Sequence, residues 1–187
     1  MVKLHVFLCF ALISGSILAQ TKVPDNLLDK EGIVYTTLSN QTYTGKYRYT
    51  LANGQDIEKG EYLNGRKNGK WQYWYLTGTI KREENYLNGK LNGIQKKWYP
   101  NGQLSSISYY SDGLKTGNWL GYYENGQAFY NIHYKNDKEE GEWKAWHQNG
   151  NLSSREFYET GKKQGTTTIG YENGNKFIEG NFENGKP

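Results

Sequence analysis

The chain has 187 residues, a formal net charge of +4 and only 35% hydrophobic residues, yet aromatic residues make up 16% of it. So many aromatic residues exclude an intrinsically disordered chain, which would contain few of them. The charge is too small and too interspersed to indicate a nucleic-acid-binding protein.

The first 19 residues have the pattern of a secretory signal peptide. Lys3 belongs to a short polar start, Val6–Ile13 is an apolar stretch, and Ala19 is the small residue expected before a cleavage site. The apolar stretch is too short to span a bilayer, and an uncleaved anchor is the alternative. We therefore expect a mature chain exported to the periplasm, the cell envelope or the medium. Cys9 is the only cysteine, so no disulfide is expected after cleavage.

Residues 20–42 are expected to lead into a repeat array. The polar stretch Gln20–Lys30 contains Pro24 and is interpreted as a spacer. The run Gly32–Leu38 is rich in β-branched and aromatic residues, which predicts a strand. We expect this strand to cap the first edge of the array, because the end units of a solenoid are atypical.

Residues 43–187 repeat with a period of 24, over about six units. Glycine recurs at positions 45, 69, 93, 117, 141 and 165, and again at 54, 78, 102, 126, 150 and 174. An aromatic residue recurs at Tyr62, Tyr86, Tyr110, Tyr134, Tyr158 and Phe182. A fixed period of this length predicts a tandem array in which each unit is one supersecondary element that contacts its neighbours.

Each unit is predicted to be a β-hairpin, with no helix after residue 30. In the unit that begins at Gly69, the two strands are expected at 70–75 and 79–86. Asn-Gly pairs stand at the turn of five units, and this pair is a strong hairpin signal because both residues tolerate positive φ. A second turn, such as Asn64-Gly65, joins successive units. The expected fold is all-β, an elongated single-layer antiparallel sheet of tandem 24-residue β-hairpin repeats.

The alternation of side chains along a strand sorts the aromatic residues onto two faces, provided that the hairpin turn has an even number of residues. One aromatic face is expected to carry Trp71, Tyr73, Tyr75, Ile80, Tyr86, Tyr110, Trp119, Tyr123, Tyr130, Ile132, Tyr134, Trp143, Leu152 and Tyr158. The opposite face is expected to be mostly polar, with one aromatic column of Trp74, Trp98, Tyr122 and Trp146. An odd turn would exchange these assignments within a unit.

The pattern NGK-x-x-G-x-W-x-x-W-Y-x-N-G, followed by an apolar residue and a closing Tyr, resembles the MORN repeat. It is most similar to the bacterial MORN-repeat variant often described as the antitoxin component of toxin–antitoxin systems. The lead-in Glu31–Tyr47 also resembles that family, and the resemblance covers about residues 31–186. It implies a twisted single-layer sheet, but this repeat is a scaffold for many functions. Asp137 departs from the pattern by replacing a joining glycine, and Thr167 and Gly170 make the last unit degenerate.

No arrangement of residues indicates an enzyme or a metal site. His133 and His147 have no carboxylate or cysteine at ligand spacing, and His147 stands in a column otherwise filled by tyrosine, which favours a packing substitution. The adjacent pairs Glu83-Glu84 and Glu139-Glu140 point to opposite faces of a strand, so they cannot form an acid/base couple. We expect no catalytic residue, no metal and no cofactor.

Three functions are compatible with this pattern. The first is an exported, non-enzymatic scaffold that binds a protein partner through the aromatic face, since a single sheet exposes more apolar area than a monomer usually tolerates. The second is binding of an envelope glycan or an anionic lipid. The third is the antitoxin or immunity role that the family resemblance suggests, although export argues against a cytoplasmic toxin.

The glycan or lipid hypothesis depends on the column of Trp74, Trp98, Tyr122 and Trp146 and on lysines expected along one long edge. These lysines stand at the joins between units, at Lys67, Lys70, Lys90, Lys115, Lys138, Lys162 and Lys163. They would attract an anionic surface, but the favoured interpretation is that they keep exposed turns and strand edges soluble. Neither a nucleic-acid partner nor a transmembrane segment in the mature chain is expected.

Overall fold

The computed structural model describes residues 27–37 and 39–187, so the predicted signal peptide and most of the predicted spacer lie outside the described residues. The described residues form strands and turns without a helix. Fourteen strands belong to one antiparallel sheet whose main path follows chain order. The predicted all-β fold of tandem hairpins is confirmed. The chain divides into two compact units, residues 1–90 and 91–187, which are described separately.

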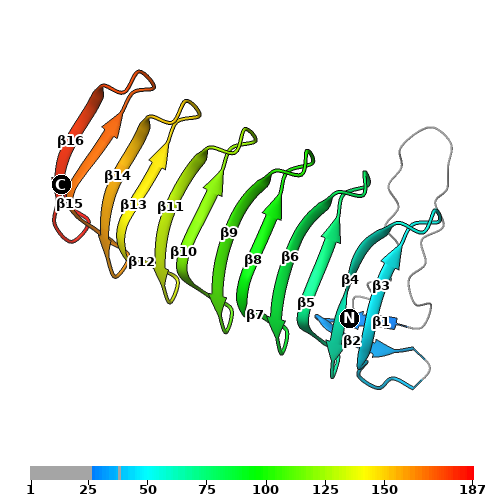
Figure 1. The fold of residues 1–187 in the computed structure, drawn as a ribbon. Coiled ribbons are helices and arrows are strands. Elements are labelled where there is room, and N and C mark those ends of the chain that lie inside the picture. Colours follow the sequence, from blue (N-terminus) through cyan, green and yellow to red (C-terminus); the bar gives the residue numbers. More distant parts are fainter. Residues whose placement is uncertain (1–26, 38) are drawn as a thin grey trace. The chain divides into compact units, whose positions relative to one another are not determined.

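In the described part of residues 1–90, two hairpins follow one another in the sheet (Figure 1). The strands of the sheet in this unit are β3 (Gly45–Thr50), β4 (Asp56–Leu63), β5 (Arg66–Trp74) and β6 (Ile80–Leu87). The two-residue strand β7 (Lys90–Leu91) pairs with β6 off the main path. A separate hairpin is formed by β1 (Leu27–Lys30) and β2 (Ile33–Thr36).

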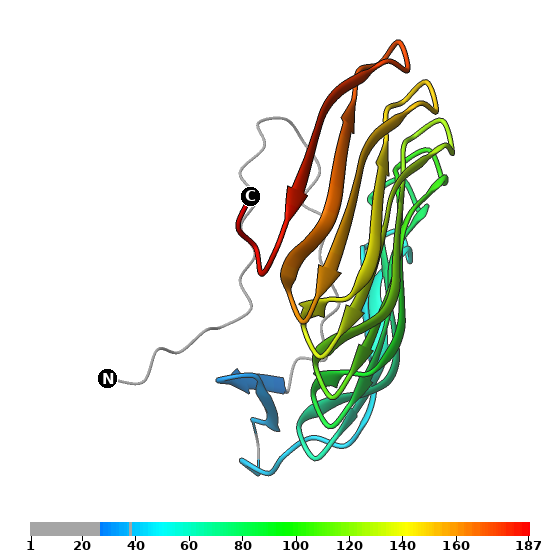
Figure 2. The same cartoon turned by 90° about the vertical axis from the view of Figure 1, so that its left-hand side faces the viewer.

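In residues 91–187, four hairpins stand side by side in one layer, which Figure 2 shows from its edge. The strands are β8 (Gly93–Trp98), β9 (Leu104–Ser111), β10 (Leu114–Tyr122), β11 (Ala128–Lys135), β13 (Gly141–Trp146), β14 (Leu152–Glu159), β15 (Lys162–Gly170) and β16 (Lys176–Phe182). The short strand β12 (Lys138–Glu139) pairs with β11.

The two kinds of turn differ in backbone geometry. At the join between β4 and β5, both Asn64 (φ 50°) and Gly65 (φ 75°) have positive φ, as a two-residue type I′ hairpin turn requires. Within the hairpin of β5 and β6, the glycine of the turn, Gly78, has positive φ (88°) but the residue before it does not. There the backbone N–H of Tyr75 donates to the carbonyl of Thr79 at 2.9 Å, which closes a three-residue loop. The two-residue turn therefore lies at the joins.

The three-residue loop is odd, yet most aromatic side chains keep the faces that an even turn predicts, because each hairpin also contains a β-bulge. In the hairpin of β5 and β6, Tyr73 pairs with Arg82 and the next residue, Trp74, pairs with Ile80. One extra residue on β6 thus compensates for the odd loop. Before the bulge, Trp71 and Tyr73 share the predicted face. Beyond it the prediction is wrong, since Ile80 is paired with Trp74.

The segment before the array does not cap the first edge of the sheet, so that expectation was wrong. β2 pairs with β1, and β3 is the terminal strand of the sheet order. The backbone N–H of Val34 donates to the carbonyl of Gly65 at 2.8 Å, and Tyr43 donates to the carbonyl of Val34 at 2.8 Å. The side chain of Val34 is only 4% exposed and packs with the aromatic residues of the sheet. Covering these rings buries apolar area that pairing with a strand edge would leave exposed.

The core of this unit lies between the β1–β2 hairpin and the aromatic face of the sheet. Trp71 is fully buried, and its ring stacks on Tyr47 with centroids 5.5 Å apart and meets the edge of Tyr62 at 4.8 Å. The indole lies over Gly60, where an added Cβ would come within 2.3 Å of the ring. Its N–H donates to the carbonyl of Glu61 at 3.1 Å. The glycine thus provides the space that the largest core side chain occupies.

We predict that Trp71→Ala lowers the free energy of unfolding by about 3–5 kcal/mol, because it leaves a large cavity over Gly60. The matched control is Trp74→Ala, which removes a half-buried ring from the opposite face and should cost clearly less. Urea denaturation followed by circular dichroism measures both. Equal losses for the two variants would contradict this description of the core.

Candidate functional site

The aromatic face of residues 27–90 contains a lysine whose amine lies over the rings. The Nζ atom of Lys67 lies 4.0 Å from the ring centroid of Trp71, 2.7 Å from the hydroxyl oxygen of Tyr73 and 3.0 Å from Oε1 of Glu58. An ammonium group over an aromatic ring is attracted by the negative ring face, and more strongly where water is excluded. Lys67 was expected at an exposed edge, but its amine is part of this face.

Burial also changes the acidity of the tyrosines on this face. Burial raises the pKa of the Tyr73 hydroxyl far above its ordinary value, and the negative charge of Glu58 raises it further. Burial likewise raises the pKa of Tyr86, whose hydroxyl donates to Oε2 of Glu84 at 2.9 Å. The pKa values of Tyr47 and Tyr62 are raised by burial and by Glu58 as well. These hydroxyls therefore stay protonated as hydrogen-bond donors.

In residues 91–187 the same face is built from the corresponding repeat positions. The ring of Trp119 lies 5.2 Å from that of Tyr110 and 5.2 Å from that of Tyr134, between the two centroids of the closing column. The amine of Lys115 lies 4.9 Å from the Trp119 centroid and 4.8 Å from the Tyr134 centroid. The structure brings these three aromatic residues together on one face, as predicted.

The last part of this face combines rings with an ion pair. Trp143 and Tyr158 lie 5.4 Å apart, and the Tyr158 hydroxyl donates to Oε2 of Glu156 at 2.6 Å. Lys163 pairs with the same carboxylate at 2.8 Å and lies 5.0 Å from the ring centroid of Phe182. Lysines thus recur over the rings at Lys67, Lys115 and Lys163, in every second repeat. The expectation that they line one long edge was wrong for these three.

The opposite face carries the predicted aromatic column. Its members, which are all half-buried, are Trp74, Trp98, Tyr122 and Trp146. Each pairs across its hairpin with an aliphatic residue, namely Ile80, Leu104, Ala128 and Leu152. Leu152 was expected on the aromatic face, and this prediction is wrong. A bulge like that of the β5–β6 hairpin shifts the register between Ala145 and Trp146, so Leu152 pairs with Trp146. The amine of Lys59 lies 5.2 Å from the Trp74 ring.

Tyr123 has a role that its predicted place on the aromatic face did not indicate. Its hydroxyl donates to the backbone carbonyl of Trp146 in the next repeat at 2.8 Å, and the hydroxyl of Tyr99 bonds to the carbonyl of Tyr122 in the same way. His147 replaces tyrosine in this column, and its Nε2 lies 2.9 Å from the carbonyl oxygen of Gly170. Since a carbonyl can only accept, Nε2 carries the proton. The tyrosine column was the sequence signal for these bonds between repeats.

A basic hollow lies on the face opposite to Trp71, across β3, β4 and β5. It has a volume of about 440 Å³, and its charged and amide lining residues are Lys46, Arg48, Lys59, Glu61, Lys70 and Gln72. Two of these cations are neutralised, since Arg48 pairs with Asp56 at 2.5 Å and Lys70 pairs with Glu83 at 2.7 Å. The hollow is therefore only weakly cationic.

Among the described residues, no group of three or more His, Cys, Asp or Glu side chains could hold a metal ion. Nδ1 of His133 lies 2.7 Å from Oδ1 of Asn118 on the exposed surface. Within residues 27–37 and 39–187 there is also no helix long and apolar enough to cross a membrane. The chemistry that the two faces offer is that of binding, through rings, ammonium groups and hydroxyls.

Comparison with known protein families agrees with this geometry. The model of the MORN repeat variant matches residues 67–88, 91–112, 115–136 and 139–159. The chain is a MORN-repeat protein. Each matched MORN segment contains one ring of the closing column, Tyr86, Tyr110, Tyr134 or Tyr158. The outer hairpins β3–β4 and β15–β16 have the same fold but lie outside the matched segments. A search of curated proteins found no match to the chain.

We predict that the MORN-repeat sheet loses stability as the pH rises above about 10, the ordinary tyrosine pKa. The folded-state pKa values of Tyr73 and Tyr86 are raised, so above this pH the unfolded chain ionises first and is favoured. Denaturant midpoints measured across this range test the effect. Tyr73→Phe removes one ionising group and should make the decline shallower. A midpoint that does not change with pH would contradict the burial of these hydroxyls.

We also predict that His147→Tyr keeps the stability of the chain, whereas His147→Phe lowers it by about 1 kcal/mol. Tyrosine can donate to the carbonyl of Gly170 as Tyr123 does to that of Trp146, but phenylalanine cannot. The two replacements differ by one hydroxyl, so each is the other's control in thermal denaturation. If both variants were equally stable, the bond between repeats would contribute nothing measurable.

Proposed function

We propose that this MORN-repeat protein is an exported, non-enzymatic scaffold that binds a protein partner at the cell envelope. MORN repeats make the chain a repeat scaffold for binding interactions. The choice of a protein partner rests on the aromatic face of residues 91–187. The proposal of export rests on the pattern of the first 19 residues. The proposal that the chain is not an enzyme rests on the sequence, in which no set of reactive groups is expected to converge.

The observation that supports this proposal is a difference between the two units. In residues 27–90, the β1–β2 hairpin lies over the rings and Val34 seals them. In residues 91–187, every strand belongs to the sheet itself, so no segment of that unit covers its aromatic face. Trp119 and Trp143 are accordingly half-buried, whereas the corresponding Trp71 is fully buried. The aromatic face of residues 91–187 is therefore accessible to a partner, whereas that of residues 27–90 is covered by the β1–β2 hairpin.

The chemistry of this surface favours a protein. Tryptophan and tyrosine contribute much of the binding energy at protein interfaces, because they combine apolar area with a polar group. Lys115 adds a positive charge beside Trp119 and Tyr134. A partner that fits would insert apolar side chains between the rings and place an acidic side chain near Lys115.

A second candidate is binding of an envelope glycan or anionic lipid by the opposite face. Trp98, Tyr122 and Trp146 are half-buried there, one in each successive hairpin. Two strand spacings separate such rings by about 9.6 Å, a spacing that suits stacking on successive sugar units. The antitoxin or immunity role rests on the family resemblance alone, and in an exported chain it would concern a toxin that acts in the envelope.

We predict that a double variant of the aromatic face, Trp119→Ser with Lys115→Glu, loses a protein partner that the wild type captures. The tagged chain is crosslinked in its native cells, and the captured proteins of envelope and medium are quantified by mass spectrometry. Loss of a hot-spot contact should reduce capture by about thirtyfold. The matched control is Tyr122→Ser with Lys144→Glu on the opposite face, which should capture as the wild type does. Circular dichroism verifies that both variants are folded.

Capture that disappears only with the control variant would contradict the proposal and point to the opposite face. If no protein were captured and the chain were retained on cell-wall polysaccharide or on anionic vesicles, the glycan or lipid function would replace it. The identity of a captured partner also distinguishes a general scaffold from an immunity protein, since the latter would bind one toxin.

A further inference from the structure

Successive hairpins are held together by side-chain donors that point in one direction along the chain. Tyr123 donates from its own hairpin to a carbonyl of the following hairpin, as described above. Side-chain amides do the same at the neighbouring turn. Nδ2 of Asn151 donates to the carbonyl of Glu172 at 2.7 Å, and Nε2 of Gln55 donates to the carbonyl of Leu76 at 3.0 Å. Each such hairpin therefore offers donors to the next and acceptors to the one before.

The last hairpin, β15–β16, carries the same donors without a following hairpin among the described residues. Tyr171 occupies the tyrosine column, and Asn175 occupies the amide column of Gln55 and Asn151. The Tyr171 side chain is 49% exposed, and Phe177 and Ile178 on β16 are 55% and 50% exposed. β16 is also the terminal strand of the sheet order, so one row of its backbone groups has no ladder partner.

The first hairpin carries the matching acceptors. The 24-residue period makes the carbonyl of Thr50 equivalent to that of Trp146, which accepts from Tyr123. It also makes the carbonyl of Ala52 equivalent to that of Glu172, which accepts from Asn151. Thr50 is the last residue of β3, the other terminal strand of the sheet order, and Ala52 lies in the turn that follows it. The donors of the last hairpin and the acceptors of the first are thus complementary.

We propose that a second copy of this chain docks its β3 against β16, so that copies join head to tail and the order of hairpins continues from one molecule to the next. Applying the register of β4 and β5 to this pair places Ile178 opposite Tyr49 and Glu179 opposite Arg48 of the second copy. The side chain of Arg48 is 65% exposed and pairs with Asp56, and that of Glu179 is 48% exposed and pairs with Lys176, so the contact would bring two exposed ion pairs of complementary order together. The contact also covers the exposed side chain of Ile178.

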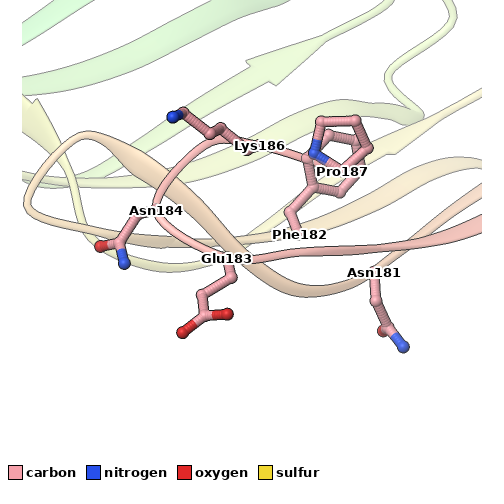
Figure 3. Close-up of a pocket in the computed structure, with 6 residues that line it drawn as sticks. All are labelled: Asn181, Phe182, Glu183, Asn184, Lys186 and Pro187. Carbon is pink, nitrogen blue, oxygen red and sulfur yellow. The ribbon is translucent and has the colours of Figure 1, made fainter.

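The pairing is confined to the part of β16 before its last residue. Lys186 and Pro187 follow the turn after β16, and Glu183 is bridged to Lys186. These two residues take the positions that residues 42 and 43 of the second copy would occupy. A hollow of about 550 Å³ beside this turn is lined by Asn181, Phe182, Glu183, Asn184, Lys186 and Pro187 (Figure 3). We therefore assign the contact to residues 177–180 of one copy and 47–50 of the other, since the carbonyl of Lys46 already accepts from the Tyr43 hydroxyl at 2.7 Å.

The same chemistry disfavours the symmetric alternatives. Two β16 edges would bring donors to donors, and two β3 edges would bring acceptors to acceptors and Arg48 close to a second Arg48. Complementarity therefore selects a heterologous contact, in which one end of a molecule binds the other end of the next. Such a contact forms chains of copies that lengthen with concentration. This inference does not depend on the proposed protein partner, since it uses the terminal strands β3 and β16 and not the rings of Trp119 and Trp143.

The test is sedimentation velocity of the purified chain over a wide concentration series, with one variant for each end. The wild type should form dimers and then longer species as the concentration rises. Arg48→Glu disables the β3 end by placing a carboxylate opposite Glu179, and Ile178→Asp disables the β16 end by placing a carboxylate opposite Tyr49. Each variant alone should associate at least about tenfold more weakly than the wild type. Mixed in equal amounts, the two should form a dimer that grows no further, because each supplies the end that the other lacks.

A wild type that stays monomeric at every concentration would overturn the proposal. So would an Arg48→Glu variant that dimerises as tightly as the wild type, which would indicate that two β16 edges pair, or an Ile178→Asp variant that does so, which would indicate that two β3 edges pair. Arg48 and Ile178 are substantially exposed in the single chain, so both variants should keep the circular dichroism spectrum of the wild type. Lys138→Glu, at the exposed join between β11 and β13, is the control variant and should associate as the wild type does.

Discussion

The faces on which the aromatic side chains lie depend on whether the turn of each hairpin has an odd or an even number of residues. The turn within each hairpin has an odd number of residues, and an odd turn by itself would send the aromatic residues of the returning strand to the other face. The one-residue bulge beside the turn offsets this, so Tyr86 returns on the same side as Trp71. Only with both irregularities present do the rings of every hairpin gather on one face. The stacking of Trp71 on Tyr47, and the grouping of Trp119 with Tyr134, follow from this compensation.

A sheet of one layer must then cover its rings with whatever the chain provides. Lys67 and Lys115 lay their stems and amines over the aromatic residues, which shields apolar area while the ammonium group gains contact with ring faces. In residues 27–90 the β1–β2 hairpin adds a second cover, and Trp71 becomes fully buried. Chain segments and lysine side chains thus do here what a second sheet does in a β-sandwich. The difference in cover between the two units is also what makes one of them the better candidate for binding.

Much of this could be read from the sequence, because the period of 24 and the alternation of strands are direct consequences of backbone geometry. The hairpins, the face of Trp71 and the column that contains Trp146 followed from them. The bulge could not be foreseen, since no residue type marks it, and so Ile80 and Leu152 were placed on the wrong face. β1 was interpreted as a spacer because two leucines in a polar stretch are a weak strand signal. Its place over the rings depends on tertiary packing that local sequence does not encode.

For the candidate site, the sequence identified which residues were aromatic but not how each was used. Tyr123 was grouped with the rings of the aromatic face, whereas its hydroxyl joins two repeats. Lys67 and Lys163 were interpreted as edge residues, and only their distances to the rings reveal that they belong to the face. Long polar side chains have many rotamers, so sequence position fixes where they begin and not where the charged end lies.

Because every join is a two-residue turn with the same backbone geometry, a whole hairpin could be duplicated or deleted without creating a new kind of turn. The joins at Asn88-Gly89 and Asp112-Gly113 are interchangeable in this sense, as both have the positive φ values of a type I′ turn. The number of hairpins is therefore a quantity that evolution can adjust in single steps of 24 residues. Adding or removing a hairpin changes the number of strands in the sheet, while the fold of each remaining hairpin stays the same.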